Sequence, residues 1–186
     1  VNLLILIPSR LMKNICSGSY GYQCDVQSVK LLSSSDRDVT SITGTHLSGR
    51  TNEDVTYLYS SGKTFNFFPN IAKFFKNLRI VYTHDTKIPV LEKSDLMQFG
   101  AQLKHFAFQN CETLEVITAD LFEGNPNLEK LYFGNQIKYV GSGAFSKLQK
   151  LSFLEFHPNP CNSGYAYDRV AVIKLTSNIE RDCTNV

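Results

Sequence analysis

A short leucine-headed pattern recurs along the chain. Four leucines lie 25, 25 and 23 residues apart, and each begins a stretch with a second apolar residue at its fourth position. The stretches are Leu78-Arg-Ile-Val81-Tyr-Thr83, Leu103-Lys-His-Phe106-Ala-Phe108, Leu128-Glu-Lys-Leu131-Tyr-Phe133 and Leu151-Ser-Phe-Leu154-Glu-Phe156, with a weaker copy at Val55-Thr-Tyr-Leu58-Tyr-Ser60. One such unit cannot bury its own apolar residues, but stacked units share a continuous core. The period therefore predicts a solenoid.

Each leucine-headed stretch is expected to be a strand of a parallel sheet. Side chains alternate between the two faces of a strand, so the fourth and sixth residues of each unit point into the core. The segments that connect the strands, residues 71–77, 94–99, 119–124 and 143–147, are short and carry apolar residues near their middle. We expect single turns of α- or 3-10 helix there, on the convex side of the solenoid.

Two pairs of cysteines flank the repeats. Cys16 and Cys24 precede them, Cys161 and Cys183 follow them, and Cys111 lies inside. The ends of a solenoid expose an apolar face, so the two pairs are interpreted as disulfides that staple terminal caps. Such bonds persist in an oxidising compartment, which predicts a secreted or extracellular protein. A zinc site is the alternative, but Cys16 and Cys24 have no histidine near them in the sequence.

The chain is divided accordingly into four parts. Residues 1–8 are a signal-peptide remnant or an N-terminal strand; their apolar run is too short to span a bilayer, and no membrane span is expected. Residues 9–52 form an N-terminal cysteine cap containing a β-hairpin, and residues 53–157 form about five repeats. Residues 158–186 form a C-terminal cap, in which Asp168 begins a helix that carries Val170, Ile173 and Ile179 toward the last repeat.

These units resemble the leucine-rich repeat family, written Leu-x-x-Leu-x-Leu-x-x-(Asn/Cys)-x-Leu. The stretches Leu121-Phe122…Leu128-Glu-Lys-Leu131 and Gly143-Ala-Phe145…Leu148…Leu151 are similar to short secreted invertebrate members and to pieces of Toll-type ectodomains. The resemblance implies an α/β fold: a short horseshoe with a parallel concave sheet, short convex helical segments, an N-terminal β-hairpin cap and a C-terminal helical cap.

The ninth position departs from the family pattern. It holds Thr86, Cys111, Gln136 and Asn159, whereas the fourth unit has its asparagine one residue early, which indicates a one-residue deletion. The family accepts cysteine at this position. Cys111 is therefore interpreted as a buried free thiol that needs no disulfide partner, with a reactive or intermolecular thiol as the alternative.

The third, fifth and seventh residues of each unit are expected on the concave face, which is the candidate binding surface. We name Tyr57, Tyr59, Tyr82, His84, His105, Gln109, Lys130, Tyr132, Phe153, Glu155 and His157 as its partner-binding residues. Exposed tyrosines are favoured contact residues, although they also pack well across neighbouring strands without any partner.

Other classes of function find little support in the sequence. Lysines and arginines are scattered and the net charge is only +2, so no nucleic-acid partner is expected. No catalytic motif, metal site or cofactor motif occurs, so an enzyme is not expected. We expect a secreted protein that binds an extracellular protein, or less favourably a glycan, possible roles being recognition or innate immunity. A matrix protein that acts by self-association is the alternative.

Overall fold

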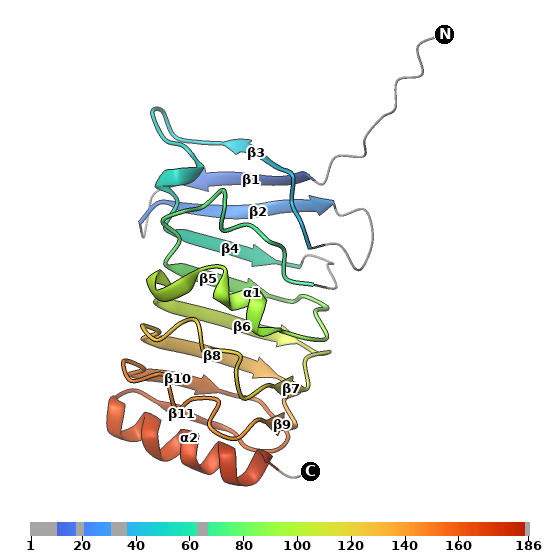
Figure 1. The fold of residues 1–186 in the computed structure, drawn as a ribbon. Helices are drawn as coiled ribbons and strands as arrows, with labels where there is room; N and C mark the ends of the chain where they lie inside the picture. The colour runs from blue at the N-terminus through green and yellow to red at the C-terminus, as the bar shows by residue number, and fades with distance from the viewer. Residues whose placement is uncertain (1–10, 18–20, 31–36, 63–66, 185–186) are drawn as a thin grey trace.

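The computed structural model describes residues 11–17, 21–30, 37–62 and 67–184, and it shows a solenoid built on a parallel sheet (Figure 1). Five parallel strands form its centre: β4 (Tyr57–Ser61), β5 (Ile80–His84), β6 (His105–Cys111), β8 (Lys130–Asn135) and β10 (Phe153–Phe156). Within the described ranges the whole sheet has nine strands, in the order β11-β10-β8-β6-β5-β4-β2-β1-β3. The predicted solenoid class is confirmed. Residues 1–8, predicted to be a signal-peptide remnant or an N-terminal strand, lie outside the described residues.

The strand register confirms the phase of the five predicted repeats. The fourth residues of the units pair across the sheet as one buried row: Leu58, Val81, Phe106, Leu131 and Leu154. Their sixth residues form a second buried row: Ser60, Thr83, Phe108, Phe133 and Phe156. The leading leucines are also fully buried. Each repeat therefore covers the apolar face of its neighbour, as stacking requires.

The fourth unit lacks one residue between its seventh and ninth positions, as predicted. The register between β6 and β8 slips at Asn110, which has a φ of 54°, so that Cys111 pairs with Asn135. The Cys111 thiol is buried, lies 3.0 Å from the Thr86 hydroxyl and forms no disulfide. Burial raises the pKa of this thiol, which keeps it protonated at neutral pH.

Asn159 fills the ninth position of the last unit and ties this unit to the previous one. Its amide nitrogen donates to the Phe133 carbonyl at 3.1 Å, and its amide oxygen accepts from the Ile137 backbone N–H at 3.0 Å. Both neighbours lie in the preceding unit. The asparagine side chain thus satisfies backbone groups that would otherwise be buried without partners.

The return segments cross one face of the sheet (Figure 1). Of the four, only residues 94–99 overlap an α-helix in the described chain, α1 (Lys93–Met97), which η2 (Gly100–Gln102) follows; the others are turns. Two short strands, β7 (Val116–Ile117) and β9 (Tyr139–Val140), pair beside them. Leu96 is buried as expected, but Met97 points outward and is half-exposed because a single helical turn has only one core-facing side.

An antiparallel pair of strands begins the sheet. β1 (Leu11–Ser17) and β2 (Gln23–Lys30) pair side by side, and the Cys16–Cys24 disulfide joins them. β3 (Ser41–Thr45) runs parallel to β1 at the edge of the sheet. The 3-10 turn η1 (Asn52–Asp54) leads into β4, with Thr51 and Asp54 forming a capping box.

A helix and a disulfide lie at the other end of the sheet. β11 (Gly164–Ala166) pairs antiparallel with β10, and α2 (Arg169–Cys183) follows. The Asp168 carboxylate accepts from the Ala171 backbone N–H at 2.8 Å, which confirms the predicted start of this helix. Cys183 is bonded to Cys161.

The face that α2 turns toward the solenoid differs from the predicted one. Ile179 is buried as expected, together with Val172 and Cys183. Val170 and Ile173, however, point to solvent and are 79% and 50% exposed. The prediction for Val170 and Ile173 is wrong because Val172, Ile179 and Cys183 form a stripe at spacings of seven and four residues, and Val170 and Ile173 fall beside it.

Candidate functional site

One face of the sheet is left open by the return segments, and all eleven predicted binding residues lie on it. We call it the open face. The parallel pairing aligns their positions in three rows across the strands. The first row holds Tyr57, Ile80, His105, Lys130 and Phe153; the second Tyr59, Tyr82, Ala107, Tyr132 and Glu155; the third Ser61, His84, Gln109, Gly134 and His157. The placement agrees with the sequence, and the use of these residues in binding stays a prediction.

Nine aromatic rings on the open face make a continuous chain of contacts. We call this set the aromatic band: Tyr57, Tyr59, Tyr82, His84, Tyr132, Phe153, His157, Tyr165 and Tyr167. Ring centroids lie 5.2 Å apart for Tyr82 and Tyr132, and 4.8 Å apart for Tyr132 and Phe153. These spacings are those of favourable aromatic pairs. His105, although on the same face, makes no ring contact with the band in the described chain.

Two members of the aromatic band were missed in the sequence. Tyr165 and Tyr167 follow the last repeat, on and just after β11, and are 48% and 72% exposed. They extend the band because β11 turns back antiparallel beside β10. The alternation Tyr165-Ala166-Tyr167 was a usable signal, since Ala166 is buried and the two tyrosines flank it on the other face.

Ala107 explains how the central rings meet. It pairs with Tyr82 on one side and Tyr132 on the other, and it is fully buried although it belongs to the open face. Its small side chain lets the two tyrosine rings close over it. Burial and a hydrogen bond with Tyr132 raise the pKa of Tyr82, and burial raises that of Tyr57, so these phenols stay neutral.

The polar residues of the open face are few. Gln109 reaches across Gly134, which has no side chain, so that its Nε2 donates to Glu155 Oε1 at 2.8 Å. Burial, and then the charge of Lys130, lower the pKa of His105, so this imidazole stays neutral to a lower pH than an ordinary histidine does.

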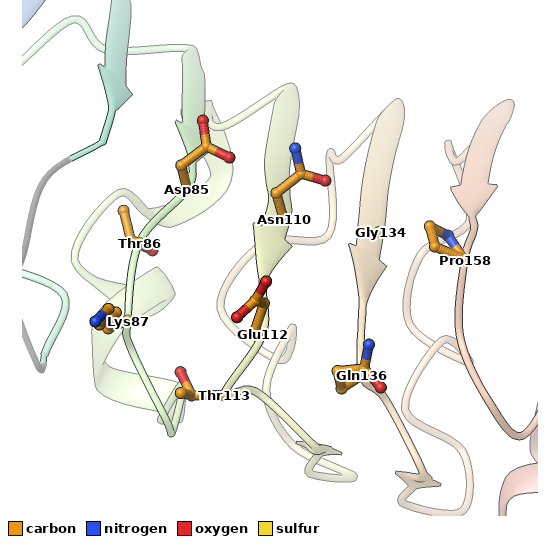
Figure 2. Close-up of a pocket in the computed structure, with 9 residues that line it drawn as sticks. All are labelled: Asp85, Thr86, Lys87, Asn110, Glu112, Thr113, Gly134, Gln136 and Pro158. Atoms are coloured by element: carbon orange, nitrogen blue, oxygen red, sulfur yellow. The ribbon is translucent and has the colours of Figure 1, made fainter.

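A polar hollow opens where the strands end. Its volume is about 600 Å³, and it is lined by Asp85, Thr86, Lys87, Asn110, Glu112, Thr113, Gly134, Gln136 and Pro158 (Figure 2). Asp85, Asn110 and Pro158 directly follow the third-row residues His84, Gln109 and His157 in the sequence. The hollow therefore adjoins the open face along the ends of β5, β6, β8 and β10. This hollow was not predicted from the sequence, because it depends on how the segments after these strands lie beside one another in space.

The structure brings one histidine close to the first pair of cysteines, which the sequence spacing did not indicate. His46 approaches Cys16 and Cys24, and the ligand atoms of the three lie within 4.8 Å of one another, which corrects the expectation that no histidine is near. The two cysteines are joined in a disulfide, however. The ring nitrogens of His46 are engaged by the Tyr22 hydroxyl at 2.9 Å and the Asn52 amide oxygen at 3.0 Å. The arrangement is that of a hydrogen-bonded histidine beside a disulfide.

Comparisons with known proteins support the fold. No family model matches the sequence, and no curated protein matches it. Among solved structures, the chain is similar to one titled as the Toll–Spatzle complex, a molecular hub in Drosophila development and innate immunity, at 12% identity and a TM-score of 0.53. The match covers 65% of this chain and 17% of that one. This similarity shows the solenoid fold. Along the described residues, no helix is both long and apolar enough to cross a membrane.

Proposed function

We propose that this chain is an extracellular leucine-rich repeat protein, or a piece of one, that binds another protein through its open face. The observation that carries the proposal is the aromatic band, because nine contacting rings lie on an uncovered sheet face and large apolar patches of this kind mark interaction sites. Tyrosine supplies a large, stiff contact surface with a polar end, and it is enriched at the residues that dominate binding energy.

The rest of the molecule fits an extracellular setting and a recognition role. The disulfides Cys16–Cys24 and Cys161–Cys183 belong to an oxidising compartment. The parallel strands β4 to β10, with their repeated apolar rows and with Cys111 and Asn159 at the ninth position of two units, resemble leucine-rich repeats. The structurally similar protein is part of the Toll–Spatzle complex, a hub in Drosophila development and innate immunity, and this supports a protein ligand in recognition.

The test removes two central rings of the band. Tyr82 and Tyr132 are changed together to alanine, and the half-exposed Tyr139 of β9, outside the open face, is changed to alanine as the matched control. Each variant is immobilised and exposed to extracellular fluid of the source organism, and the affinity of the captured protein is then measured in purified form. Circular dichroism checks that both variants remain folded.

We expect the Tyr82→Ala/Tyr132→Ala variant to lose at least about tenfold in affinity, because each residue would act as a binding hot spot. The Tyr139→Ala control should bind as the unchanged protein does. Equal binding by all three folded proteins would refute the proposal. Open-ended assembly with rising protein concentration, without a partner, would favour the matrix role instead.

A further inference from the structure

The carboxylate of Glu155 lies within a frame of aromatic rings on the open face. Tyr132 of β8 and Tyr165 of β11 pair with Glu155 in register, one on each side. Directly opposed residues on neighbouring strands have their Cβ atoms about 5 Å apart. Phe153 and His157 stand two residues before and after Glu155, which places them along the same face. Aromatic residues therefore occupy the four positions next to Glu155 on this face of the sheet.

Contacts join these rings into an arc around Glu155 that runs from Tyr132 to His157. The ring centroids of His157 and Tyr165 lie 5.2 Å apart, and those of Tyr132 and Phe153 lie 4.8 Å apart. Tyr167 links these two pairs, with its ring 5.5 Å from Phe153 and stacked at 6.4 Å on Tyr165. The sequence places nothing comparable around any other acidic residue of the open face.

Glu155 is half-buried and carries a charge that the frame does not neutralise. Within the described chain it accepts one hydrogen bond, from Gln109, and forms no ion pair with a lysine, arginine or histidine. An ionised carboxylate offers about four acceptor sites, so most of its capacity is open. Partly burying such a charge has a cost that a cation would offset.

A carboxylate flanked by aromatic rings is an environment that favours a basic side chain. The rings attract a cation through their negative faces, and the carboxylate forms a charge-assisted hydrogen bond with it. Arginine suits such a site better than lysine, because its planar guanidinium stacks on rings and pairs with a carboxylate through two N–H groups.

The charges around the frame favour the same ligand. The second row of the open face continues at its far end to Asp25, which pairs with Tyr59. The polar hollow adds Asp85, Glu112 and Lys87. Together with Glu155 and Lys130, these six described residues are four carboxylates and two lysines with a formal charge of −2, in a chain whose net charge is +2. The open face is thus complementary to a basic epitope.

We propose that Glu155, Tyr132 and Tyr165 form a subsite that accepts an arginine side chain of the protein partner. The proposal rests on the proposed function, since it names the chemistry by which the open face recognises its ligand. Arginine would enter between the two tyrosine rings and meet the carboxylate end-on, while Gln109 keeps Glu155 oriented.

The first experiment uses a small probe and the intact chain. N-acetyl-arginine amide is titrated at low ionic strength while NMR follows the tyrosine ring signals; N-acetyl-citrulline amide, which has nearly the same shape but no charge, is the matched ligand. The variants are Glu155→Gln, which keeps the side-chain shape, and Asp25→Asn, which removes a carboxylate that has an aromatic neighbour on one side only.

We expect the arginine probe to bind at millimolar concentration and to shift the signals of Tyr132 and Tyr165. Glu155→Gln should weaken the affinity for the arginine probe at least about fivefold, and Asp25→Asn should leave this affinity within twofold of the unchanged chain. The citrulline probe should bind the unchanged chain no better than it binds Glu155→Gln. The subsite would be overturned if the unchanged chain bound both probes with equal affinity, or if Glu155→Gln bound the arginine probe as tightly as the unchanged chain does. So would shifts confined to other residues.

A second measurement separates this inference from the proposed function. With the purified partner, Glu155→Gln and Tyr82→Ala/Tyr132→Ala are compared side by side. Loss of binding in the tyrosine variant with full binding by Glu155→Gln would leave the open face as the binding surface and overturn the arginine subsite. Full partner binding by both variants would refute the proposed function, and Glu155-dependent binding of the arginine probe would then show an arginine site that this partner does not use.

Discussion

A buried ion pair between distant parts of the chain provides the sharpest stability prediction. Arg37, which follows β2, pairs with the fully buried carboxylate of Asp95 in α1, and its guanidinium also lies 3.2 Å from Glu92 and stacks over Phe67. Asp95 further accepts from the Glu92 backbone N–H at 2.9 Å. Changing Arg37 to alanine leaves this carboxylate buried without its counter-ion.

The expected cost follows from the burial of both partners. Arg37 is 17% exposed and Asp95 is 0% exposed, so solvent screens the pair little. Breaking one side of a buried pair typically costs about 3–5 kcal/mol. For a domain of this size that is a fall in Tm of about 6–20 °C. Asp95→Asn, which removes the charge and keeps an oxygen to accept from the Glu92 N–H, should cost about 1 kcal/mol.

The pH dependence supplies a second and independent check. Burial raises the pKa of Asp95 above its usual value despite the opposing effect of Arg37. The folded chain therefore binds a proton more readily than the unfolded chain, and the free energy of unfolding decreases as pH rises through that range. Without Arg37 the pKa rises further, so the cost of Arg37→Ala should be largest at pH 7 and smaller at pH 5.

Urea unfolding followed by circular dichroism measures these quantities for the unchanged chain, Arg37→Ala, Asp95→Asn and the double variant. The double variant should be more stable than Arg37→Ala alone, because it no longer buries a lone charge. A loss below 1 kcal/mol for Arg37→Ala at pH 7, or a loss equal at pH 5 and pH 7, would refute the reasoning.

Two further predictions concern single side chains. The Ser60 hydroxyl is buried, and no hydrogen-bond partner for it exists in the described part of the chain, so Ser60→Ala should raise the free energy of unfolding by about 1 kcal/mol; a decrease would mean that the hydroxyl is satisfied. NMR titration should place the pKa of His105 below its usual 6.5, so stability should fall as pH drops below about 6.5. In Lys130→Ala the pKa of His105 should rise, and an unchanged value would show that burial alone causes the shift.

The strands and their register were predictable because their signal is local and repeated. Alternation within each unit assigns Phe106 to the core and His105 to the open face, and five copies in phase exclude a slip by one residue, which would reverse every side chain. The shortened fourth unit was predictable for the same reason. The face of α2 was not, because residues such as Val170 and Ile173 have no repeated copy to check their phase.

The sequence by itself determined the solenoid, its core rows, the face that carries the tyrosines and the pairing of the four cysteines, since each depends on periodic spacing or on position relative to the repeats. Only the tertiary structure decided the Arg37–Asp95 pair, the polar hollow and the aromatic frame of Glu155. These features join residues whose separation follows no period. Tyr165, for example, meets Glu155 only because β11 reverses direction beside β10. The free energy that selects such contacts comes from burial in three dimensions, which no local pattern records.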